Sequence, residues 1–330
     1  MRALLVVVLV LTACSNQPAA TSPTPSPTAA ATTAAPSPTP TTSPSPSPIT
    51  LPSFAQLSAP SGTVVWALVG GTRLFRSSDR GDTWVERSRP SNLADIEIGF
   101  ADETNGILLN TGSPALQCQT QTVTIWKTAD GAASWEQVTA TGIGDALCKT
   151  GLTSSDTTHA LFTASQFGGA PLMYRTADGG ASWTASAPIP VPPNLASQGS
   201  MFVITGRPRG FGSVVLVDGG GGQQTKDVFR STDGGATFAY ASTVPTFEGT
   251  VAYLTATRWL QIAPPSSSRE TTDGGASWHA YTTDYSQAAP IAPQIVFGDA
   301  MVGYATVRGE IQRTTDGGAH WTKIKTPGTA

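Results

Sequence analysis

Short runs in which apolar and polar residues alternate recur along the chain after residue 50, with turn-forming residues between them. One stretch has four such runs, at Ile96 to Phe100, Gly106 to Asn110, Thr122 to Lys127 and Trp135 to Val138. A later stretch has the same plan, at Gln294 to Phe297, Val302 to Val307, Glu310 to Arg313 and Trp321 to Ile324. A period of two bounded by turns predicts β-strands. Because 34 Gly and 26 Pro also argue against long helices, the sequence predicts an all-β head.

An octapeptide motif precedes the last run of each stretch, and the chain contains it six times. Its pattern is Ser or Thr, any residue, Asp, any residue, Gly, any residue, Ser or Thr, then Trp or Phe, with His320 at the seventh position of the last copy. The aspartates and terminal aromatic residues are Asp79, Asp130, Asp178, Asp233, Asp273, Asp316, Trp84, Trp135, Trp183, Phe238, Trp278 and Trp321. Successive aspartates stand 40 to 55 residues apart, which in strand-rich units indicates the blades of a β-propeller. We therefore predict one propeller over residues 51–330 with six four-stranded blades, seven being the weaker alternative.

The chemistry of the motif suits a tight turn between two strands. Glycine permits a positive φ, and the aspartate can accept hydrogen bonds from turn amides that would otherwise be unpaired. The terminal aromatic residue should be buried against a neighbouring sheet. A single catalytic carboxylate would not need six copies, so we interpret these aspartates as structural. The second copy has Ala132 at the glycine position, which predicts a shifted or strained turn.

Two further features concern how the blades join. A cation stands just before most copies of the motif, and we expect it to pair with a carboxylate or carbonyl of a neighbouring blade: Arg76, Lys127, Arg175, Arg230 and Arg313. Each unit also runs in order from its first to its fourth strand. We therefore expect the ring to close by packing between the first and last units, without an exchanged strand.

The N-terminus has the features of an export signal. Met1 and Arg2 precede an apolar run from Ala3 to Leu11, which is too short to serve as a stable membrane span. The following Thr12-Ala13-Cys14 resembles the end of a bacterial lipoprotein signal, in which cleavage after residue 13 leaves a lipid-modified cysteine. The alternative is an ordinary signal peptide. Lipidation of Cys14 would anchor the exported chain on the outer face of the cell membrane, or on an outer membrane if the host has one.

Residues 14–50 form the predicted tether between the lipid and the head. After Cys14 they are almost entirely Pro, Thr, Ser and Ala, without a charged residue. Such a segment buries too little apolar surface to offset the entropy of ordering, so we expect it to be disordered.

Charge and cysteine content narrow the possible partners. The formal net charge is −3 and no basic run occurs, which argues against nucleic acid. Cys118 and Cys148 are an even pair in an exported protein and therefore predict one disulfide, with two buried free thiols as the alternative. The three histidines are isolated in the sequence, so we predict no metal site and no cofactor.

The octapeptide resembles the Asp-box, or bacterial neuraminidase repeat, found in sialidases, in the sortilin ectodomain and in non-catalytic propellers. The repeats are most similar to those of the photosystem II assembly and stability factor family. Phe100-Ala101-Asp102 with Gly106, and Phe297-Gly298-Asp299 with Gly303-Tyr304, match the strand that precedes the box in that family. The resemblance covers residues 53 to 327 and implies the propeller fold, whereas the fold itself carries many functions.

Three functions remain open. We favour a non-catalytic, monomeric binding or assembly head for an envelope protein or a glycan. The alternative is a sialidase-like exo-glycoside hydrolase, which needs an arginine triad, a Tyr nucleophile with a Glu partner, and an Asp acid/base. The Arg-Ile-Pro tripeptide that supplies one of those arginines in sialidases does not occur here, so we assign no catalytic residue. A purely structural spacer ranks lowest.

A candidate binding face follows from the expected topology. The loops between the second and third strands, and those between blades, should lie opposite the octapeptides. Ring closure should then bring together residues of the first, fifth and sixth units near one mouth: Arg73, Asp284, Tyr285, Arg308 and Glu310. The alternative is that these side chains are scattered and solvated.

Overall fold

The computed structural model describes residues 47–112, 118–166, 169–196, 202–221, 226–263, 267–285 and 293–330. These residues belong to one compact unit, Ser47–Ala330. The expectations for the signal peptide, for Cys14 and for the tether up to residue 46 lie outside the described residues. The only α-helix in the described part is α1 (Pro193–Ala196), and no helix there is long and apolar enough to cross a membrane.

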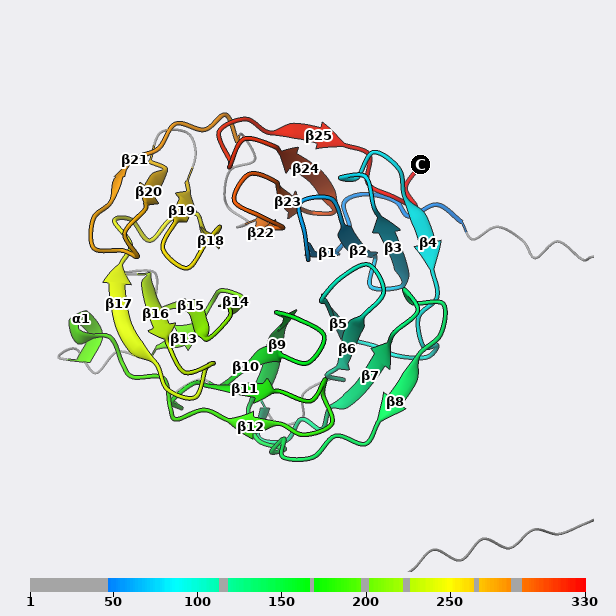
Figure 1. Ribbon diagram of the computed structural model, residues 1–330, viewed down its shortest axis with the longest axis horizontal. Coiled ribbons are helices and arrows are strands. Elements are labelled where there is room, and N and C mark those ends of the chain that lie inside the picture. Colours follow the sequence, from blue (N-terminus) through cyan, green and yellow to red (C-terminus); the bar gives the residue numbers. More distant parts are fainter. Residues whose placement is uncertain are drawn as a thin grey trace, which may run out of the picture. The chain divides into compact units, whose positions relative to one another are not determined.

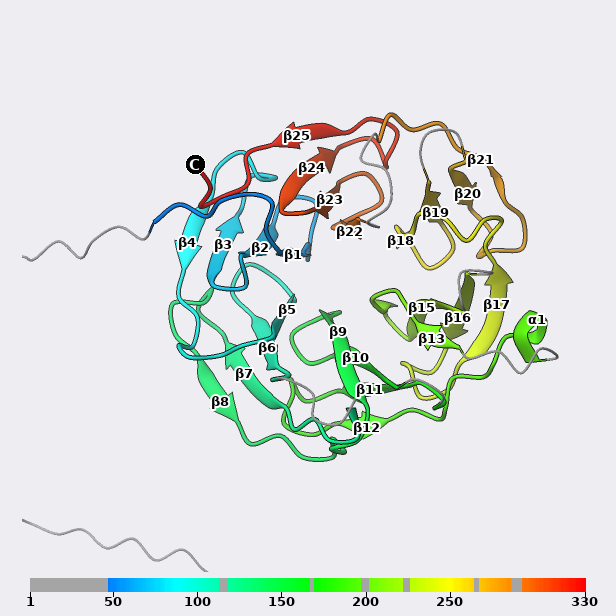
Figure 2. The ribbon, with the colours of Figure 1, turned by 180° about the vertical axis from the view of Figure 1, so that it is seen from behind.

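Six antiparallel sheets surround a common centre, as Figure 1 and Figure 2 show from opposite sides. Blade one comprises β1 (Ala55–Ser58), β2 (Val65–Val69), β3 (Arg73–Ser77) and β4 (Val85–Arg87). Blade two comprises β5 (Ile96–Phe100), β6 (Gly106–Asn110), β7 (Thr124–Thr128) and β8 (Glu136–Val138). Blade three comprises β9 (Cys148–Ser154), β10 (Ala160–Ser165), β11 (Leu172–Thr176) and β12 (Thr184–Ala185).

The second half of the ring has the same plan with one addition. Blade four comprises β13 (Val203–Ile204), β14 (Arg209–Phe211), β15 (Val214–Gly220), β16 (Asp227–Ser231) and β17 (Ala239–Thr243). Blade five comprises β18 (Thr250–Tyr253), β19 (Trp259–Ile262), β20 (Arg269–Thr271) and β21 (His279–Ala280). Blade six comprises β22 (Gln294–Phe297), β23 (Gly303–Val307), β24 (Glu310–Thr314) and β25 (Thr322–Ile324). The predicted all-β propeller of six blades is confirmed.

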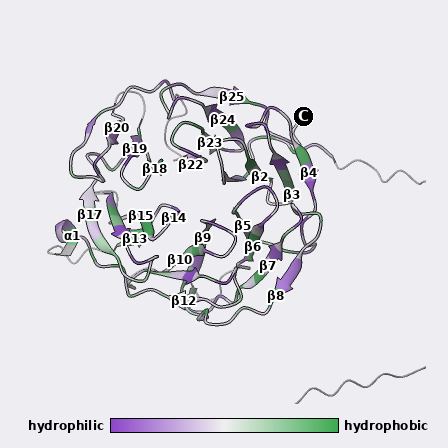
Figure 3. Cartoon of the chain, in the orientation of Figure 1, coloured by the Kyte–Doolittle hydropathy of each residue, from purple (hydrophilic) through white to green (hydrophobic). Residues whose placement is uncertain are grey.

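The core consists of layers between the blades. In the described residues, buried apolar side chains form six clusters, each shared by two neighbouring blades. Strand β2 is buried along its whole length because blades cover both of its faces, whereas the outer strand β8 is mostly exposed. Figure 3 shows the corresponding change from hydrophobic colour on β2 and β6 to hydrophilic colour on β8.

The ring closes by packing, as predicted. Leu57 and Val65 of blade one share a buried cluster with Tyr304 and Ile311 of blade six, and every sheet takes its strands from one continuous stretch of chain. The ordered head begins before residue 51, because the Ile49 amide donates a 2.8 Å hydrogen bond to the Gly328 carbonyl. The two ends of the described head therefore lie side by side (Figure 1).

The octapeptides form the expected turns between the third and fourth strands. In blade three, Asp178 Oδ1 accepts hydrogen bonds from the amides of Ala181 and Ser182 at 3.0 and 2.9 Å. The Thr176 hydroxyl donates to the same carboxylate and accepts from the Gly180 amide at 2.9 Å. In all five other copies the Asp accepts from the amide at the seventh position, and the first Ser or Thr hydroxyl donates to the Asp and accepts from the amide at the fifth position. The terminal aromatic residues are buried in three copies and half-buried in the other three.

The second octapeptide keeps this geometry despite its alanine. Ala132 adopts a φ of +60°, and its amide donates to the Thr128 hydroxyl at 2.9 Å as the glycines do elsewhere. The turn is therefore not shifted. The departure is the positive φ of Ala132 itself, a conformation that is less favourable for an L-residue than for glycine.

Several of the cations before the octapeptides join neighbouring blades, as expected. Arg76, Arg230 and Arg313 donate to carbonyl oxygens of the adjoining blade, at Glu103, Ala256 and Arg80. In blade five, Arg258, just before β19, takes this role by donating to the Ala300 carbonyl at 3.1 Å. These contacts lie at different blade boundaries, so the four arginines do not form a cluster.

A disulfide bond joins Cys118 to Cys148, with their Cα atoms 4.9 Å apart. Cys118 lies in the segment before β7 and Cys148 is the first residue of β9, so the bond links blades two and three. The Leu147 amide also donates to the Cys118 carbonyl at 2.8 Å.

Candidate functional site: the central cavity

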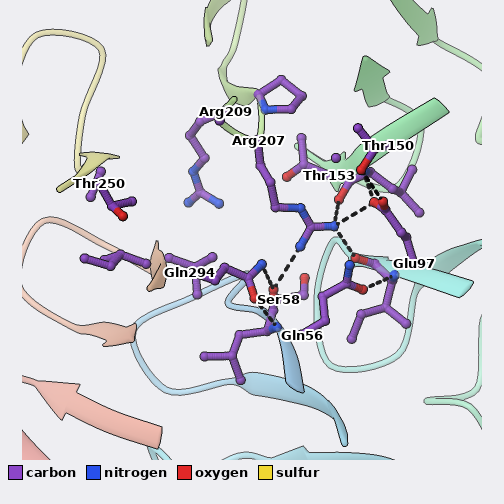
Figure 4. Close-up of a pocket in the computed structure, with 18 of the residues that line it drawn as sticks. Gln56, Ser58, Glu97, Thr150, Thr153, Arg207, Arg209, Thr250 and Gln294 are labelled. Carbon is purple, nitrogen blue, oxygen red and sulfur yellow. Dashed lines mark hydrogen bonds and ion pairs between the residues drawn. The ribbon is translucent and has the colours of Figure 1, made fainter. Parts of the chain in front are cut away.

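A cavity of about 570 Å³ lies where the inner strands of the six blades meet. Polar side chains from every blade line it and are shown in Figure 4: Gln56, Glu97, Thr150, Arg207, Thr250 and Gln294. Each of these residues is on, or next to, the first strand of its blade. The first strand has no further strand on its axial side, so it offers unpaired backbone groups and side chains to the cavity.

Side chains pair these free strand edges from one blade to the next. Gln294 Oε1 accepts a 2.9 Å hydrogen bond from the Leu57 amide, and Gln56 Oε1 accepts one of 2.6 Å from the Ile98 amide. In the next blade, Glu97 Oε2 accepts a 2.7 Å bond from the Leu152 amide. Blades six, one, two and three are therefore linked around the cavity by the same kind of bond.

The first strand of blade four is interrupted. Residues 205–208 separate β13 from β14, although both strands pair with β15. Pro208 has no amide hydrogen for the ladder, and a side chain at Gly206 would collide with Asp218, since its Cβ would lie 1.9 Å from Oδ1. The segment therefore leaves the sheet and places Arg207 in the cavity.

Arg207 binds to three other blades. Its Nη2 atom donates to the Leu152 carbonyl at 2.6 Å and forms an ion pair with Glu97 at 3.2 Å, while Nη1 reaches the Leu57 carbonyl at 3.4 Å. The side chain is 23% exposed. Burial lowers the pKa of Arg207, and the charge of Glu97 opposes that shift. Arg207 thus continues the ring of bonds where the strand of its own blade is broken.

The contact between blades four and five centres on Asp218. The Tyr253 hydroxyl donates to Asp218 Oδ1 at 3.1 Å and the Thr205 hydroxyl to Oδ2 at 3.3 Å. Lys226, nearby, donates to the Gly249 carbonyl at 2.5 Å. Burial raises the pKa of Asp218, and the positive charge of Lys226 opposes this shift. Thr250 completes the ring by donating to the Pro293 carbonyl at 2.9 Å.

Arg209 differs from the other cations of the cavity. It is the first residue of β14, and Figure 4 shows its side chain extending into the cavity beside Arg207. Its Nε atom is buried without a hydrogen-bond partner, and its guanidinium carbon lies 5.6 Å from the centre of the Phe211 ring. Burial lowers the pKa of Arg209.

The five residues of the expected binding face are not brought together. Arg73 pairs with Glu86 on its own sheet at 2.5 Å, and Glu310 of blade six pairs with Lys323 of the same blade. Arg308 lies in the turn between β23 and β24, where its carbonyl accepts from the Ser53 amide at 2.9 Å. None of these three lines the central cavity.

Asp284 and Tyr285 pack on an octapeptide instead of lying opposite it. Asp284 Oδ1 accepts a 2.7 Å hydrogen bond from the Trp321 amide, and the Tyr285 ring packs edge-on against Trp321. Tyr285 is 2% exposed, and burial raises its pKa. The outer strand of each blade runs along the rim of the ring (Figure 1), so the segment after it covers the octapeptide of the next blade.

The polar residues of the cavity were missed by the sequence reasoning. One signal was present: Gly206-Arg207-Pro208-Arg209-Gly210 stands where blade four should have an alternating first strand. Two cations around a proline in that position indicate a strand that leaves its sheet. The structure also groups no three His, Cys, Asp or Glu side chains as a metal site within the residues it describes.

No family model and no curated protein sequence matches the chain. Among solved structures, YCF48 bound to a D1 peptide matches with 14% identity and a TM-score of 0.51, over 84% of this chain and 82% of that one. YCF48 from Cyanidioschyzon merolae matches with 14% identity and a TM-score of 0.50, over 85% of this chain and 86% of that one. These likenesses show a shared fold, in agreement with the resemblance to photosystem II assembly factors. An α-L-arabinofuranosidase from Fusarium graminearum also matches, with 15% identity and a TM-score of 0.44 over 73% of this chain and 84% of that one, and bears on neither fold nor activity.

Proposed function

We propose that the propeller is a non-catalytic binding head that receives part of an envelope protein or glycan at the mouth of its central cavity. The supporting observation is that Glu97 and Asp218, two carboxylates that line the cavity, are held by other groups of the protein. Glu97 is bonded to the Leu152 amide and to Arg207, and Asp218 to Tyr253 and Thr205. Carboxylates engaged in this way stabilise the cavity wall and are poorly placed to exchange protons with a substrate.

The mouth of the cavity offers a contact surface for such a partner. Phe54 precedes β1, lines the cavity and is 54% exposed. An exposed aromatic side chain beside a polar recess is a common anchor in binding surfaces. Phe247 stands three residues before β18 and is 50% exposed, but it does not line the cavity.

These two phenylalanines provide a matched test. The full chain, cross-linked in its own cells, should capture a reproducible partner, and Phe54→Ser should lose that partner while Phe247→Ser retains it. Equal capture by both variants would contradict binding at the cavity mouth.

The alternative function is glycoside hydrolysis, and one observation favours it. Glu97 and Asp218 line the same cavity, and burial raises the pKa of Asp218, as a general acid requires. The purified chain should nevertheless show no turnover of a fluorogenic sialoside or of a panel of other glycosides. Turnover that Asp218→Asn abolishes without unfolding the protein would overturn the non-catalytic proposal.

Anchoring at the outer face of the cell membrane is part of the proposal. It rests on the apolar run that ends at Cys14 in the sequence. The chain should incorporate labelled palmitate and sediment with membranes, whereas Cys14→Ser should do neither. Sedimentation of the unlabelled variant would point to another means of attachment.

A further inference from the structure

The last octapeptide differs from the other five at its seventh position. The others have a Ser or Thr there, and its hydroxyl donates to the Asp of the same turn, as Ser182 does to Asp178 at 2.5 Å. The last copy has His320, whose Nδ1 atom lies 2.6 Å from Asp316 Oδ2, while its amide donates to Asp316 Oδ1 at 3.0 Å. The imidazole therefore replaces the hydroxyl group and adds to the turn a group that can gain a charge near neutral pH.

The segment of blade five that packs on this octapeptide carries an acid beside the histidine. The Asp284 amide donates to the Ala319 carbonyl at 3.0 Å, and Asp284 Oδ1 accepts from the Trp321 amide at 2.7 Å. Ala319 and Trp321 are the residues directly before and after His320. The contact between blades five and six is therefore made on both sides of the imidazole.

The boundary between blades two and three shows the same contact with neutral side chains. The Thr141 amide donates to the Ala181 carbonyl at 3.0 Å, and the Thr141 carbonyl accepts from the Trp183 amide at 2.9 Å. Ser182 lies between these two residues, at the position that His320 holds in blade six. The contact itself therefore does not require an ionisable pair, and the pair is an addition at the boundary of blades five and six.

Two carboxylates act on the imidazole, one from each blade. The hydrogen bond with Asp316 raises the pKa of His320, and the negative charges of Asp316 and Asp284 raise it further against the opposing effect of burial. The side chain of His320 is 78% exposed, so it can exchange protons with the solvent. Protonation therefore increases the attraction between the two blades at this place.

Other titratable groups of blade five near this octapeptide already have partners. Arg258, whose guanidinium lies beside Gly317, pairs with Glu270 at 2.7 Å. The Tyr281 hydroxyl donates to the Gly317 carbonyl at 2.9 Å. These bonds do not depend on His320, so its charge acts mainly through the two aspartates.

We propose that His320 makes the contact between blades five and six pH-dependent: the imidazolium attracts Asp316 and Asp284 and holds the blade-five segment on the last octapeptide. The neutral imidazole keeps a hydrogen bond with Asp316 but loses the attraction to both charges, so the segment should open more often. Because the folded pKa lies above the ordinary value of 6.5, this attraction is fully present below that pH and is lost as the pH rises through the folded pKa. The inference does not depend on what binds at the cavity.

Hydrogen exchange at single amides, measured by NMR on the purified protein, tests the proposal. The Trp321 amide reports on the segment, and the Trp183 amide, in the equivalent bond between neutral residues, corrects for the intrinsic pH dependence of exchange. The ratio of the Trp321 rate to the Trp183 rate should rise about two- to fivefold between about pH 5.5 and about pH 8.5, as expected for an exposed charge pair. In His320→Ser, which restores the residue of three other copies, the ratio should stay constant.

Two further variants separate the charge of His320 from general effects. His279→Ser is the matched control, because His279 lies on β21 with its Nε2 atom 3.3 Å from the Ser277 hydroxyl, and it should keep the pH dependence of the parent protein. Asp284→Asn keeps an oxygen acceptor for the Trp321 amide but removes one charge, so it should weaken the pH dependence.

Three outcomes would overturn the proposal. The first is a ratio that does not change with pH in the parent protein, and the second is a ratio that rises equally in His320→Ser. The third is a ratio in His320→Ser that exceeds the parent's value at the highest pH, because the neutral imidazole would then already hold the segment and the role of His320 would be structural.

Discussion

Arg207 in blade four donates a 2.6 Å hydrogen bond to the carbonyl oxygen of Leu152 in blade three. The contact exists because the first strand of blade four is broken just before Pro208, which frees Arg207 from the sheet. Through Glu97 and the Leu57 carbonyl, the same guanidinium also reaches blades two and one. One side chain therefore replaces the edge contacts that an uninterrupted strand would make.

Replacing this arginine should destabilise the propeller. Arg207→Gln leaves Glu97 without its cation and the Leu152 carbonyl without its donor, so we expect the free energy of unfolding to fall by about 2–4 kcal/mol. Urea unfolding, monitored by tryptophan fluorescence, measures this loss in the free energy of unfolding. Arg209→Gln is the matched control, because it removes an arginine of the same cavity that has no acceptor. An equal loss in both variants would show that the hydrogen bonds and ion pair of Arg207 do not contribute to the free energy of unfolding.

The bond that closes the ring offers a second test. Gln294 of blade six accepts from the Leu57 amide of blade one, and methionine has a similar shape without the acceptor. Gln294→Met should lower the free energy of unfolding by about 1–2 kcal/mol, since the Leu57 amide is left unpaired. Hydrogen exchange at the Leu57 amide should also accelerate. Gln137→Met, on the exposed outer strand β8, should change neither quantity. Unchanged exchange at Leu57 in Gln294→Met would contradict a role of this bond in closure.

The octapeptide aspartates should cause part of the loss in the free energy of unfolding at acidic pH. Hydrogen bonds from the Thr83 and Ser134 side chains lower the pKa of Asp79 and of Asp130 to about 2. Between pH of about 4 and 2 the unfolded carboxylates take up protons that the folded ones do not. Stability from these groups is therefore complete above about pH 4 and is lost as the pH falls toward 2.

Urea titrations at a series of pH values between 7 and 2 measure this loss. Asp130→Asn removes one titrating group and should flatten the acid slope while lowering stability at neutral pH. Asp82→Asn is a suitable control, because Asp82 lies inside an octapeptide turn and accepts from Arg313 instead of from the turn amides. A slope that Asp130→Asn leaves unchanged would show that other groups cause the acid unfolding.

The sequence predicts the blades well because each octapeptide satisfies the hydrogen bonds of its own turn. Asp178 and Thr176 satisfy the amides of their turn locally, so the pattern determines the turn without reference to the other blades. The cavity is different, since it is formed by residues more than two hundred positions apart, such as Gln294 and Leu57. The expected place of Tyr285, opposite the octapeptides, was wrong because the sequence does not reveal that the segment after the outer strand of blade five packs on the next octapeptide.

The glycine position of the octapeptide allows a comparison within one chain. Gly275 has a φ of +92°, and a Cβ there would lie 2.5 Å from the Cβ of Ser242. Gly275→Ala should therefore lower the free energy of unfolding by about 2 kcal/mol or more, from backbone strain and steric overlap together. At the equivalent position Ala132 has a φ of +60°, where an L-residue is far less strained.

The reverse change, Ala132→Gly, should alter the free energy of unfolding by less than about 1 kcal/mol. Glycine relieves the positive φ, but it also removes a buried methyl group and adds entropy to the unfolded chain, so the effects nearly cancel. Urea unfolding of both variants under one set of conditions makes the comparison. A loss in Gly275→Ala as small as the change in Ala132→Gly would mean that the octapeptide turn adapts freely to a side chain. In that case glycine at this position would reflect something other than the backbone geometry of the turn.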